Sequence, residues 1–305
     1  MISLVIPLKN EAQSLEKLLQ EIRTIAEASH HDQWEIIAVD DGSDDNTWQL
    51  LHQIDLTPLH LKGIRFSRNF GKEAAIYAGL SEASGNPVIV MDGDGQHPPS
   101  MLPEMIKKWE SGALIVEAVK TKRPPEPLWK RLFTAFFYKL FRRATGLDLT
   151  TATDFKLLDR KVVESYLALP ERNRFFRGLI KWFNYPTEEI VFEASQRQKG
   201  VSSWPFKSLV SFAWNSIVSF SVWPLRTLMV AGIAGIAGAI LILLQTLYCK
   251  FSGKAAPGFS TVIILQLLLG SSILFGLGLV GEYVSKIYEE LKKRPRYVVL
   301  ERFEK

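Results

Sequence analysis

Two aspartates separated by one glycine are the residues whose type and spacing most clearly indicate chemistry in this sequence. Asp92 and Asp94 follow the apolar run 88–91, which predicts a buried strand. Carboxylates at the end of a buried strand are costly unless a positive charge neutralises them. Hard oxygen ligands suit Mg²⁺ or Mn²⁺, and such ions usually also bind substrate phosphates. The alternative is an acidic surface turn, and the short motif alone does not decide between them.

The elements around this motif predict an α/β domain with a mainly parallel sheet, because strands alternate with helices. In such sheets, ligands bind beyond the carboxyl ends of the strands. Asp40 and Asp41 follow the second predicted strand, so they should lie at the same edge as Asp92 and Asp94. Four carboxylates at one edge favour a metal–phosphate site. No G-x-G-x-x-G motif follows the first strand, which argues against a dinucleotide-binding fold of the dehydrogenase type. Strands are predicted at 2–6, 34–39, 61–66, 88–91 and 114–119.

The overall charge of the chain limits its partners. The 305 residues carry a formal net charge of +5, which is compatible with nucleic acid, anionic lipid or a phosphorylated substrate. The aromatic residues of the basic stretches fall on helix faces rather than on a strand platform for bases, which argues against nucleic acid. The single cysteine, Cys249, excludes an internal disulfide. The first residues are typical of a strand and not of a signal peptide.

Two uncharged segments near the carboxyl terminus, 227–249 and 259–281, are each 23 residues long. About 20 apolar residues suffice to span a bilayer, so these segments predict a transmembrane hairpin. The alternative is a hydrophobic hairpin buried in a soluble protein. Basic residues on both sides predict that the catalytic domain and both termini lie in the cytoplasm. Aromatic faces with basic or polar borders at 128–143 and 209–223 predict helices on the membrane surface. The predicted organisation is a catalytic domain at 1–200, an interfacial linker at 201–226, the two spans, and a basic cytoplasmic tail at 282–305.

A series of motifs in order along the chain resembles the family 2 glycosyltransferases, and among them the polyprenyl-phosphate glycosyltransferases. This group includes bactoprenol glucosyltransferases, dolichol-phosphate mannose synthases and aminoarabinose transferases, and the bactoprenol type looks most similar. The resemblance implies a GT-A fold and an inner or plasma membrane location, and the glycine-rich faces of the two predicted spans favour a homo-oligomer. It also implies inverting, metal-dependent transfer of a hexose from a nucleotide sugar to a polyprenyl phosphate. The motifs are VIPLKNE, VDDGSDDNT, FSRNFGKEAA, DGDGQHPP, DFKLLDRKVV, ERNRF and GEYVSKIYEELKKRP.

The same resemblance assigns roles to individual residues. The nucleotide sugar would contact Pro7, Glu11, Val39, Asp41, Asp92, Gly93, Asp94 and Lys120. Mg²⁺ or Mn²⁺ would be held by Asp92, Asp94 and Gln96. Donor or acceptor phosphates would contact Lys120, Arg123 and Arg197.

Two positions depart from the family pattern. Lys120 stands where the family often has an arginine, which keeps the charge but loses the bidentate fork. Ser203 stands where the family usually has a lysine, so one phosphate contact is either lost or supplied by Lys199 or Lys207. These departures affect the details of the acceptor site and not the reaction class.

Asp154 matches the position proposed as the catalytic base of the family. A lipid phosphate is already ionised near pH 7, so a strong base is not essential. Asp154 would therefore either orient the sugar or acceptor, or take the last proton from a monoanionic phosphate. The non-catalytic alternative is a cap carboxylate paired with Arg160 or Lys161.

The leading interpretation is transfer of glucose from UDP-glucose to undecaprenyl phosphate. GDP-mannose, or another UDP-sugar such as an aminoarabinose derivative, would keep the mechanism and change the donor. Processive polysaccharide synthesis is disfavoured because no Q-x-x-R-W signature follows Gln196. An inactive membrane scaffold is the alternative from a different class, and the intact Asp92, Asp94 and Gln96 argue against it.

Overall fold

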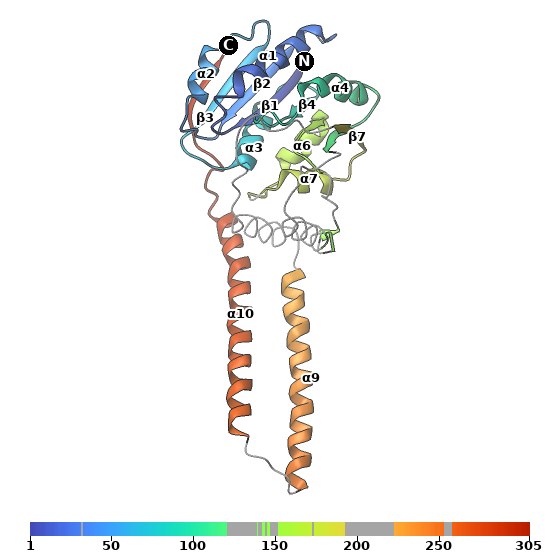
Figure 1. Ribbon diagram of the computed structural model, residues 1–305, viewed down its shortest axis with the longest axis vertical. Helices are drawn as coiled ribbons and strands as arrows, with labels where there is room; N and C mark the ends of the chain where they lie inside the picture. Colours follow the sequence, from blue (N-terminus) through green and yellow to red (C-terminus); the bar gives the residue numbers. More distant parts are fainter. Residues whose placement is uncertain are drawn as a thin grey trace. The chain divides into compact units, whose positions relative to one another are not determined.

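The computed structural model describes residues 1–31, 33–120, 139, 142–143, 145–146, 152–172, 174–192, 223–252 and 258–305. The chain divides into two compact units (Figure 1). The first unit comprises Met1–Trp204 together with Arg294–Lys305, and the second comprises Pro205–Lys293. All strands of the described chain belong to the first unit, so this unit contains the predicted α/β domain.

The described strands form an eight-stranded sheet in the order β7-β5-β6-β4-β1-β2-β3-β8. The four strands β4, β1, β2 and β3 are parallel to one another, as the sequence predicted. Strands β6 and β8 run antiparallel to their neighbours, so the complete sheet is mixed. The bounds are β1 Ile2–Leu8, β2 Trp34–Asp40, β3 His60–Phe66, β4 Val88–Val90, β5 Ile115–Lys120, β6 Lys156–Leu158, β7 Thr187–Phe192 and β8 Val299–Glu304.

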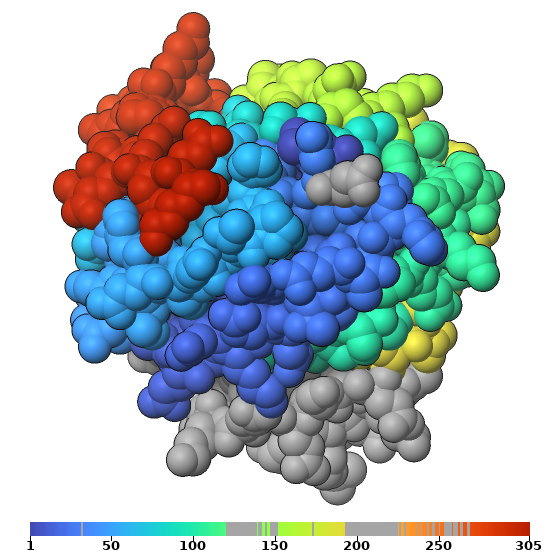
Figure 2. Space-filling model, turned by 90° about the horizontal axis from the view of Figure 1, so that it is seen from above, coloured from blue at the N-terminus to red at the C-terminus, as the bar shows by residue number. Residues whose placement is uncertain are grey.

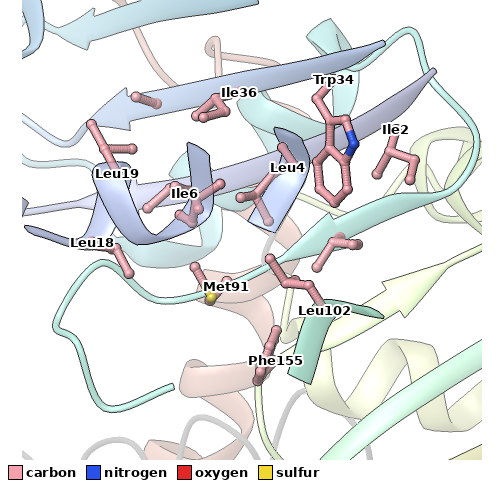
Figure 3. Packing of buried hydrophobic residues seen from close by; sticks show 14 of the residues in the cluster. Ile2, Leu4, Ile6, Leu18, Leu19, Trp34, Ile36, Met91, Leu102 and Phe155 are labelled. Carbon is pink, nitrogen blue, oxygen red and sulfur yellow. The ribbon is translucent and has the colours of Figure 1, made fainter. Parts of the chain in front are cut away.

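Helices cover both faces of this sheet, which explains why β1 and β2 are buried along their whole length. On one face, Leu4 and Ile6 of β1 join Leu18 and Leu19 of α1 in the hydrophobic core (Figure 3). On the other face α3 lies directly against β1, since a Cβ at Gly79 would overlap Val5. The helices are α1 Leu15–Ala28, α2 Thr47–Gln53, α3 Lys72–Glu82, the 3-10 turn η1 Pro99–Met101, α4 Leu102–Glu110, α6 Arg160–Ala168, α7 Phe176–Trp182, α9 Trp223–Phe251 and α10 Phe259–Leu291.

The carboxyl terminus returns to the sheet as β8, which pairs with the free edge of β3. Phe303 lies over Gly63 of β3, where any Cβ would overlap its ring. The Trp48 indole N–H of α2 donates a hydrogen bond of 2.6 Å to Glu301. Figure 2 shows these C-terminal residues in red against the blue residues of the amino-terminal half. The sequence predicted only a basic tail at 282–305, whereas α10 continues to Leu291 and an ordered edge strand follows.

The two long helices of the second unit are α9, with 29 residues, and α10, with 33. Their described apolar side chains include exposed ones, such as Leu241 and Phe275. Across the part of the chain that the structure describes, no helix combines the length and the apolarity needed to cross a membrane.

This finding contradicts the predicted transmembrane helices at 227–249 and 259–281, and with them the predicted multi-pass membrane location with cytoplasmic termini. The prediction counted consecutive uncharged residues, and the absence of charge is a weaker criterion than the apolarity that a spanning helix requires. The predicted surface helix at 128–143 and the linker at 201–226 lie mostly outside the described residues.

Candidate active site

The predicted acidic loops meet at one edge of the sheet because the strands before them are parallel and in register. Pro7 of β1 pairs with Val39 of β2, and Leu8 pairs with Asp40. On the other side of β1, the Met91 amide donates to the Val5 carbonyl oxygen at 3.0 Å. The loops after β1, β2 and β4 therefore leave the sheet at its carboxyl edge, where the sequence placed the site.

Asp41 fastens the loop after β2 to the loop before α3. Its carboxylate is buried and accepts hydrogen bonds from the backbone amides of Phe70, at 2.6 Å, and Gly71, at 2.9 Å. Burial raises the pKa of Asp41. The two loops touch at Gly42, where a Cβ would lie 2.6 Å from the backbone carbonyl carbon of Arg68. Gly42 also has a φ of +63°, so both space and backbone conformation favour glycine there.

Asp40 is wholly buried next to this loop. Its Oδ1 accepts a hydrogen bond of 2.9 Å from the Ser43 amide, and its Oδ2 lies 3.4 Å from Nε of Arg65. The guanidinium of Arg65 also lies 3.8 Å from Glu301 of β8. A buried carboxylate needs such compensation, so Asp40 serves to hold the loop that carries Asp41.

Glu11 lies beside the D-G-D turn through Ser14. The Ser14 hydroxyl lies 2.9 Å from Oε2 of Glu11 and 3.1 Å from the carbonyl oxygen of Gly93. The Glu11 amide donates to Oγ1 of Thr47 at 3.0 Å, which ties the segment before α1 to the start of α2. Glu11 and Gly93, two of the residues expected to contact the nucleotide sugar, are thus brought close together by Ser14.

The D-G-D turn packs against buried aromatic rings on one side, and its acidic side chains are partly exposed on the other. The Asp92 amide donates to Nδ1 of His97 at 3.3 Å, and the buried His97 ring stacks on Phe155 with 5.1 Å between centroids. Asp94 accepts a hydrogen bond of 3.0 Å from the Gln96 amide, and both side chains are half-buried. The acidic groups of the turn therefore lie where a ligand can reach them.

Sheet register also brings Asp154 to this turn. Val90 of β4 pairs with Lys156 of β6 in an antiparallel arrangement. Two residues beyond Val90 is Asp92, and two residues before Lys156 is Asp154, so the register places them side by side. The DGDGQH and DFKLL motifs are thus neighbours in the fold, although they are far apart in the sequence.

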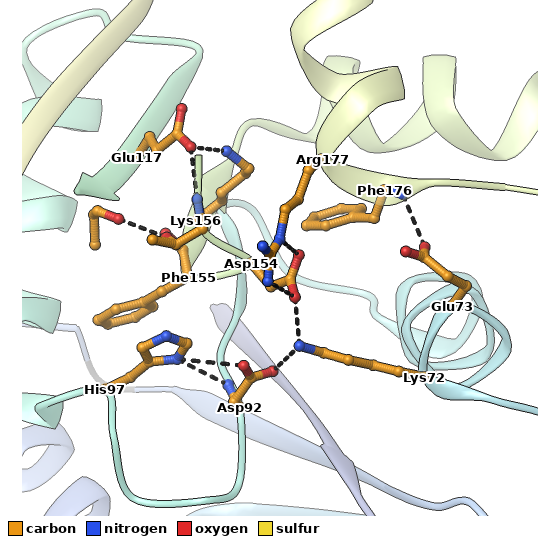
Figure 4. Close-up of polar contacts among 12 residues, drawn as sticks. Lys72, Glu73, Asp92, His97, Glu117, Asp154, Phe155, Lys156, Phe176 and Arg177 are labelled. Carbon is orange, nitrogen blue, oxygen red and sulfur yellow. Dashed lines mark hydrogen bonds and ion pairs between the residues drawn. The ribbon is translucent and has the colours of Figure 1, made fainter. Parts of the chain in front are cut away.

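Lys72 connects these two carboxylates. It is the first residue of α3, and its ammonium lies 2.5 Å from Oδ1 of Asp92 while also donating to Oδ2 of Asp154 (Figure 4). Burial alone would lower the pKa of Lys72, but Asp154 and Asp92 outweigh it and raise the pKa above its usual range. The ammonium therefore stays charged between the two motifs.

Arg177 of α7 holds Asp154 from the other side. Its Nε donates to Oδ1 at 2.6 Å and its Nη2 to Oδ2 at 2.7 Å, a bidentate pair. Burial would raise the pKa of Asp154, but Arg177 and Lys72 outweigh it and hold that pKa well below its usual range. Asp154 is thus a fixed, ionised carboxylate.

Two further contacts fix the segments that carry these groups. The Phe176 amide, at the start of α7, donates to Glu73 at 2.8 Å, so the first turn of α3 also anchors the helix of Arg177. Burial raises the pKa of Glu73 to about 8. Beneath Asp154, Lys156 of β6 forms a buried ion pair with Glu117 of β5 (Figure 4).

The sequence motifs assigned no role to Lys72 or Arg177. The signal was present, because Lys72 lies in the FGKEAA motif and Arg177 follows the basic ERNRFF stretch. The cap alternative for Asp154 is not what the structure shows, since Asp159 caps α6 by accepting from the Lys161 amide at 3.0 Å. Lys120 ends β5, opposite Phe192. Arg123, Arg197, Lys199, Ser203 and Lys207 lie outside the described residues.

The residues of the D-G-D turn fit a divalent cation that is completed by substrate. Among the described residues, no three His, Cys, Asp or Glu side chains are arranged to hold a metal ion. Mg²⁺, however, is usually bound by one or two carboxylates together with water and phosphate oxygens. Oδ1 of Asp92 is buried without a hydrogen bond and has only the ion contact with Lys72. Asp92, Asp94 and Gln96 therefore supply suitable oxygen donors.

The fold and this site together are typical of an α/β enzyme whose functional loops meet at the carboxyl edge of the sheet. Residues 3–167 match the family model described as Glycosyl transferase family 2, and the chain belongs to this family of glycosyltransferases.

Relatives of known name support this assignment over nearly the full length. The chain is 36% identical to the uncharacterized glycosyltransferase YkcC of Bacillus subtilis, over 97% of this chain and 92% of the relative. It is 34% identical to the bactoprenol glucosyl transferase of Shigella phage SfII, over 98% and 97%. The resemblance to the family 2 glycosyltransferases is therefore confirmed.

A solved structure confirms the fold. Glucosyl-3-phosphoglycerate synthase from Mycobacterium tuberculosis, crystallised with Mn²⁺, UDP-glucose and phosphoglyceric acid, aligns with a TM-score of 0.53 at 17% identity. The alignment covers 72% of this chain and 78% of that one.

Proposed function

We propose that this glycosyltransferase transfers a hexose from a nucleotide sugar to a polyprenyl phosphate, with inversion at the anomeric carbon. The acceptor class is supported by 34% identity, over nearly the full length, to a bactoprenol glucosyl transferase. Glucose is the proposed sugar on the same basis, and UDP-glucose is the donor that the sequence resemblance favours. One observation supports the mechanism most directly: Lys72 contacts both Asp92 and Asp154. The proposed site for the donor phosphates therefore lies next to a second, ionised carboxylate.

The nucleotide would bind across the loops after β1 and β2, near Pro7, Glu11, Val39 and Asp41. Register pairs Pro7 with Val39, and the amides of the loop before α3 hold Asp41, so this surface is preformed. The sugar diphosphate would then lie over the D-G-D turn. A Mg²⁺ or Mn²⁺ ion at Asp92, Asp94 and Gln96 would neutralise the charge that develops on the leaving diphosphate.

Asp154 is proposed to orient the reacting groups. A carboxylate with a strongly lowered pKa is a poor proton acceptor, and Arg177 and Lys72 both favour its ionised form. The acceptor phosphate is itself ionised near pH 7, so attack does not require removal of a proton. Asp154 would therefore position the sugar or the acceptor, and the alternative role as a base is less consistent with its contacts.

A donor screen tests this proposal. The purified chain would be incubated with undecaprenyl phosphate, Mg²⁺ or Mn²⁺ and a panel of UDP- and GDP-sugars, and lipid-linked product would be followed by mass spectrometry. We expect product from UDP-glucose, lost with a chelator and in Asp94→Asn, and retained in the control Asp55→Asn. Asp55 is an exposed residue between α2 and the amino end of β3, whereas the D-G-D turn follows the carboxyl end of β4. NMR of the intact lipid-linked product, in which the glycosyl phosphate fixes the anomeric carbon, distinguishes inversion from retention.

Other outcomes change the proposal in defined ways. Product from GDP-mannose or from an aminoarabinose donor would keep the mechanism and replace the donor. Retention of configuration would refute the inverting mechanism. Complete absence of product from every donor, with no binding of any nucleotide sugar, would favour the inactive scaffold.

A further inference from the structure

Lys72 contacts two carboxylates that the reaction needs for different purposes. Its ammonium touches Asp92, which would hold the metal, and Asp154, which would orient the reactants. The side chains of Asp92 and Asp154 are 20% and 6% exposed, so each carries a charge that water screens poorly. Arg177 places a second cation on Asp154.

The two cations differ in how firmly they are held. Arg177 is committed to Asp154 by a bidentate pair. Lys72 is a compact charge on a flexible stem, and its single ammonium is shared between Asp92 and Asp154. Its contact with Asp92 is confined to Oδ1, an atom with no hydrogen bond of its own. The Lys72–Asp92 contact is therefore the exchangeable one in this cluster.

We propose that Lys72 is a positioning residue that occupies the cation position beside Asp92 until a divalent ion binds the D-G-D turn. The inference rests on the proposed function and extends it by naming the cation that lies beside Asp92 before the metal ion binds. A divalent ion on Asp92 and an ammonium 2.5 Å from the same carboxylate would repel each other. Binding of the ion therefore displaces Lys72 from Asp92 and leaves it on Asp154.

This exchange has two consequences of opposite sign. Lys72 weakens metal binding in the absence of donor, because the ion must displace an existing partner of Asp92. Lys72 also supports turnover, because it fixes Asp154 together with Arg177. A residue with only a structural role would lower metal affinity and turnover together when it is removed.

The test compares Mn²⁺ binding and turnover in Lys72→Met. Binding of Mn²⁺ alone to the full chain is measured from the loss of the free-ion signal in electron paramagnetic resonance. We expect Mn²⁺ affinity to rise about tenfold, because the ion no longer competes with an ammonium for Asp92, while turnover falls at least about tenfold. Lys72→Arg should keep the low, wild-type metal affinity because it keeps the charge.

Lys62→Met is the matched control. Lys62 lies 2.9 Å from the buried carboxylate of Glu35, towards the amino ends of the strands. The control therefore removes a lysine–carboxylate pair away from the D-G-D turn, and neither Mn²⁺ affinity nor turnover should change in the folded protein. If Lys72→Met does not fold, Lys72→Gln removes the same charge and carries the same expectation.

Unchanged or weaker Mn²⁺ binding in the folded Lys72 variants that lack the charge would overturn the inference. Mn²⁺ binding by the wild type and by Asp94→Asn tests separately whether the metal site itself exists. If Asp94→Asn does not weaken Mn²⁺ binding, or if no saturable binding occurs, the metal site of the proposed function is refuted, and the exchange at Asp92 with it.

Discussion

Replacing Lys156 with methionine should strongly destabilise the sheet beneath the active site. Lys156 of β6 and Glu117 of β5 are register partners and form an ion pair whose side chains are only 2% and 3% exposed. The Thr153 amide donates a further hydrogen bond of 3.1 Å to Glu117. Methionine keeps most of the lysine stem and removes the ammonium, so the buried Glu117 carboxylate retains, among the described residues, only the Thr153 amide.

The magnitude follows from this burial. Removing one partner of a buried ion pair costs about 3–5 kcal/mol, because the remaining charge is left uncompensated. For a unit of this size, each kcal/mol lowers the unfolding midpoint by about 2–4 °C, so a loss of about 6–20 °C is expected. Thermal unfolding followed by circular dichroism measures it. Turnover should also fall, since Asp154 lies two residues before Lys156.

A double variant separates lost charge balance from lost packing. In Glu117→Gln/Lys156→Met both charges are gone, and the glutamine oxygen can still accept from the Thr153 amide. Replacing both partners of a buried pair is often close to neutral, so the double variant should recover most of the lost stability.

An exposed pair provides the control. Lys108 and Glu188 lie 3.0 Å apart, with side chains 31% and 59% exposed. Lys108→Met should cost less than about 1 kcal/mol. Equal midpoint shifts for Lys108→Met and Lys156→Met, or a double variant no more stable than Lys156→Met, would refute the reasoning.

Three further predictions concern the other supports of the site. The pKa of Glu73 rises from 4.5 to about 8 in the fold, so its contribution to stability is complete below pH 4.5 and is lost as pH rises through 8. Glu73→Gln should flatten this part of the pH profile in urea unfolding, and an unchanged slope would contradict the burial argument. Gly42→Ala forces a Cβ to 2.6 Å from the backbone of Arg68, so the donor KM should rise about tenfold or more, and wild-type kinetics would contradict the close contact between these two loops. Gly63→Ala should expel the Phe303 ring and increase hydrogen exchange in β8, whereas unchanged protection would show that the ring is not needed there.

Much of the α/β unit was predictable from the sequence for a local reason. Strands buried on both faces require unbroken apolar runs, and the predicted strands at 2–6, 34–39 and 61–66 match β1, β2 and β3 to within two residues. The parallel arrangement of strands separated by helices then placed Asp40, Asp41 and Asp92 at one edge. Residue types and chain order were sufficient for these conclusions, and the motifs were sufficient for the family.

Hydropathy counting was less reliable for the second unit. The uncharged runs at 227–249 and 259–281 correspond to α9 and α10, so the helices themselves were predictable. The conclusion that they cross a membrane was wrong for the described chain. The absence of charged residues from a segment does not by itself establish that the segment spans a membrane.

Only the tertiary structure decided which charges and which edges meet. Lys72, Asp92, Asp154 and Arg177 come from four separate segments, and each could be a solvated surface charge when considered alone. The antiparallel register of β4 and β6 and the position of α3 bring them within contact distance. The strand β8 likewise has its partner more than 200 residues earlier in the chain. Hydrophobic periodicity is recorded locally in the sequence, whereas ion pairs and edge pairing depend on distances that exist only after the chain has folded.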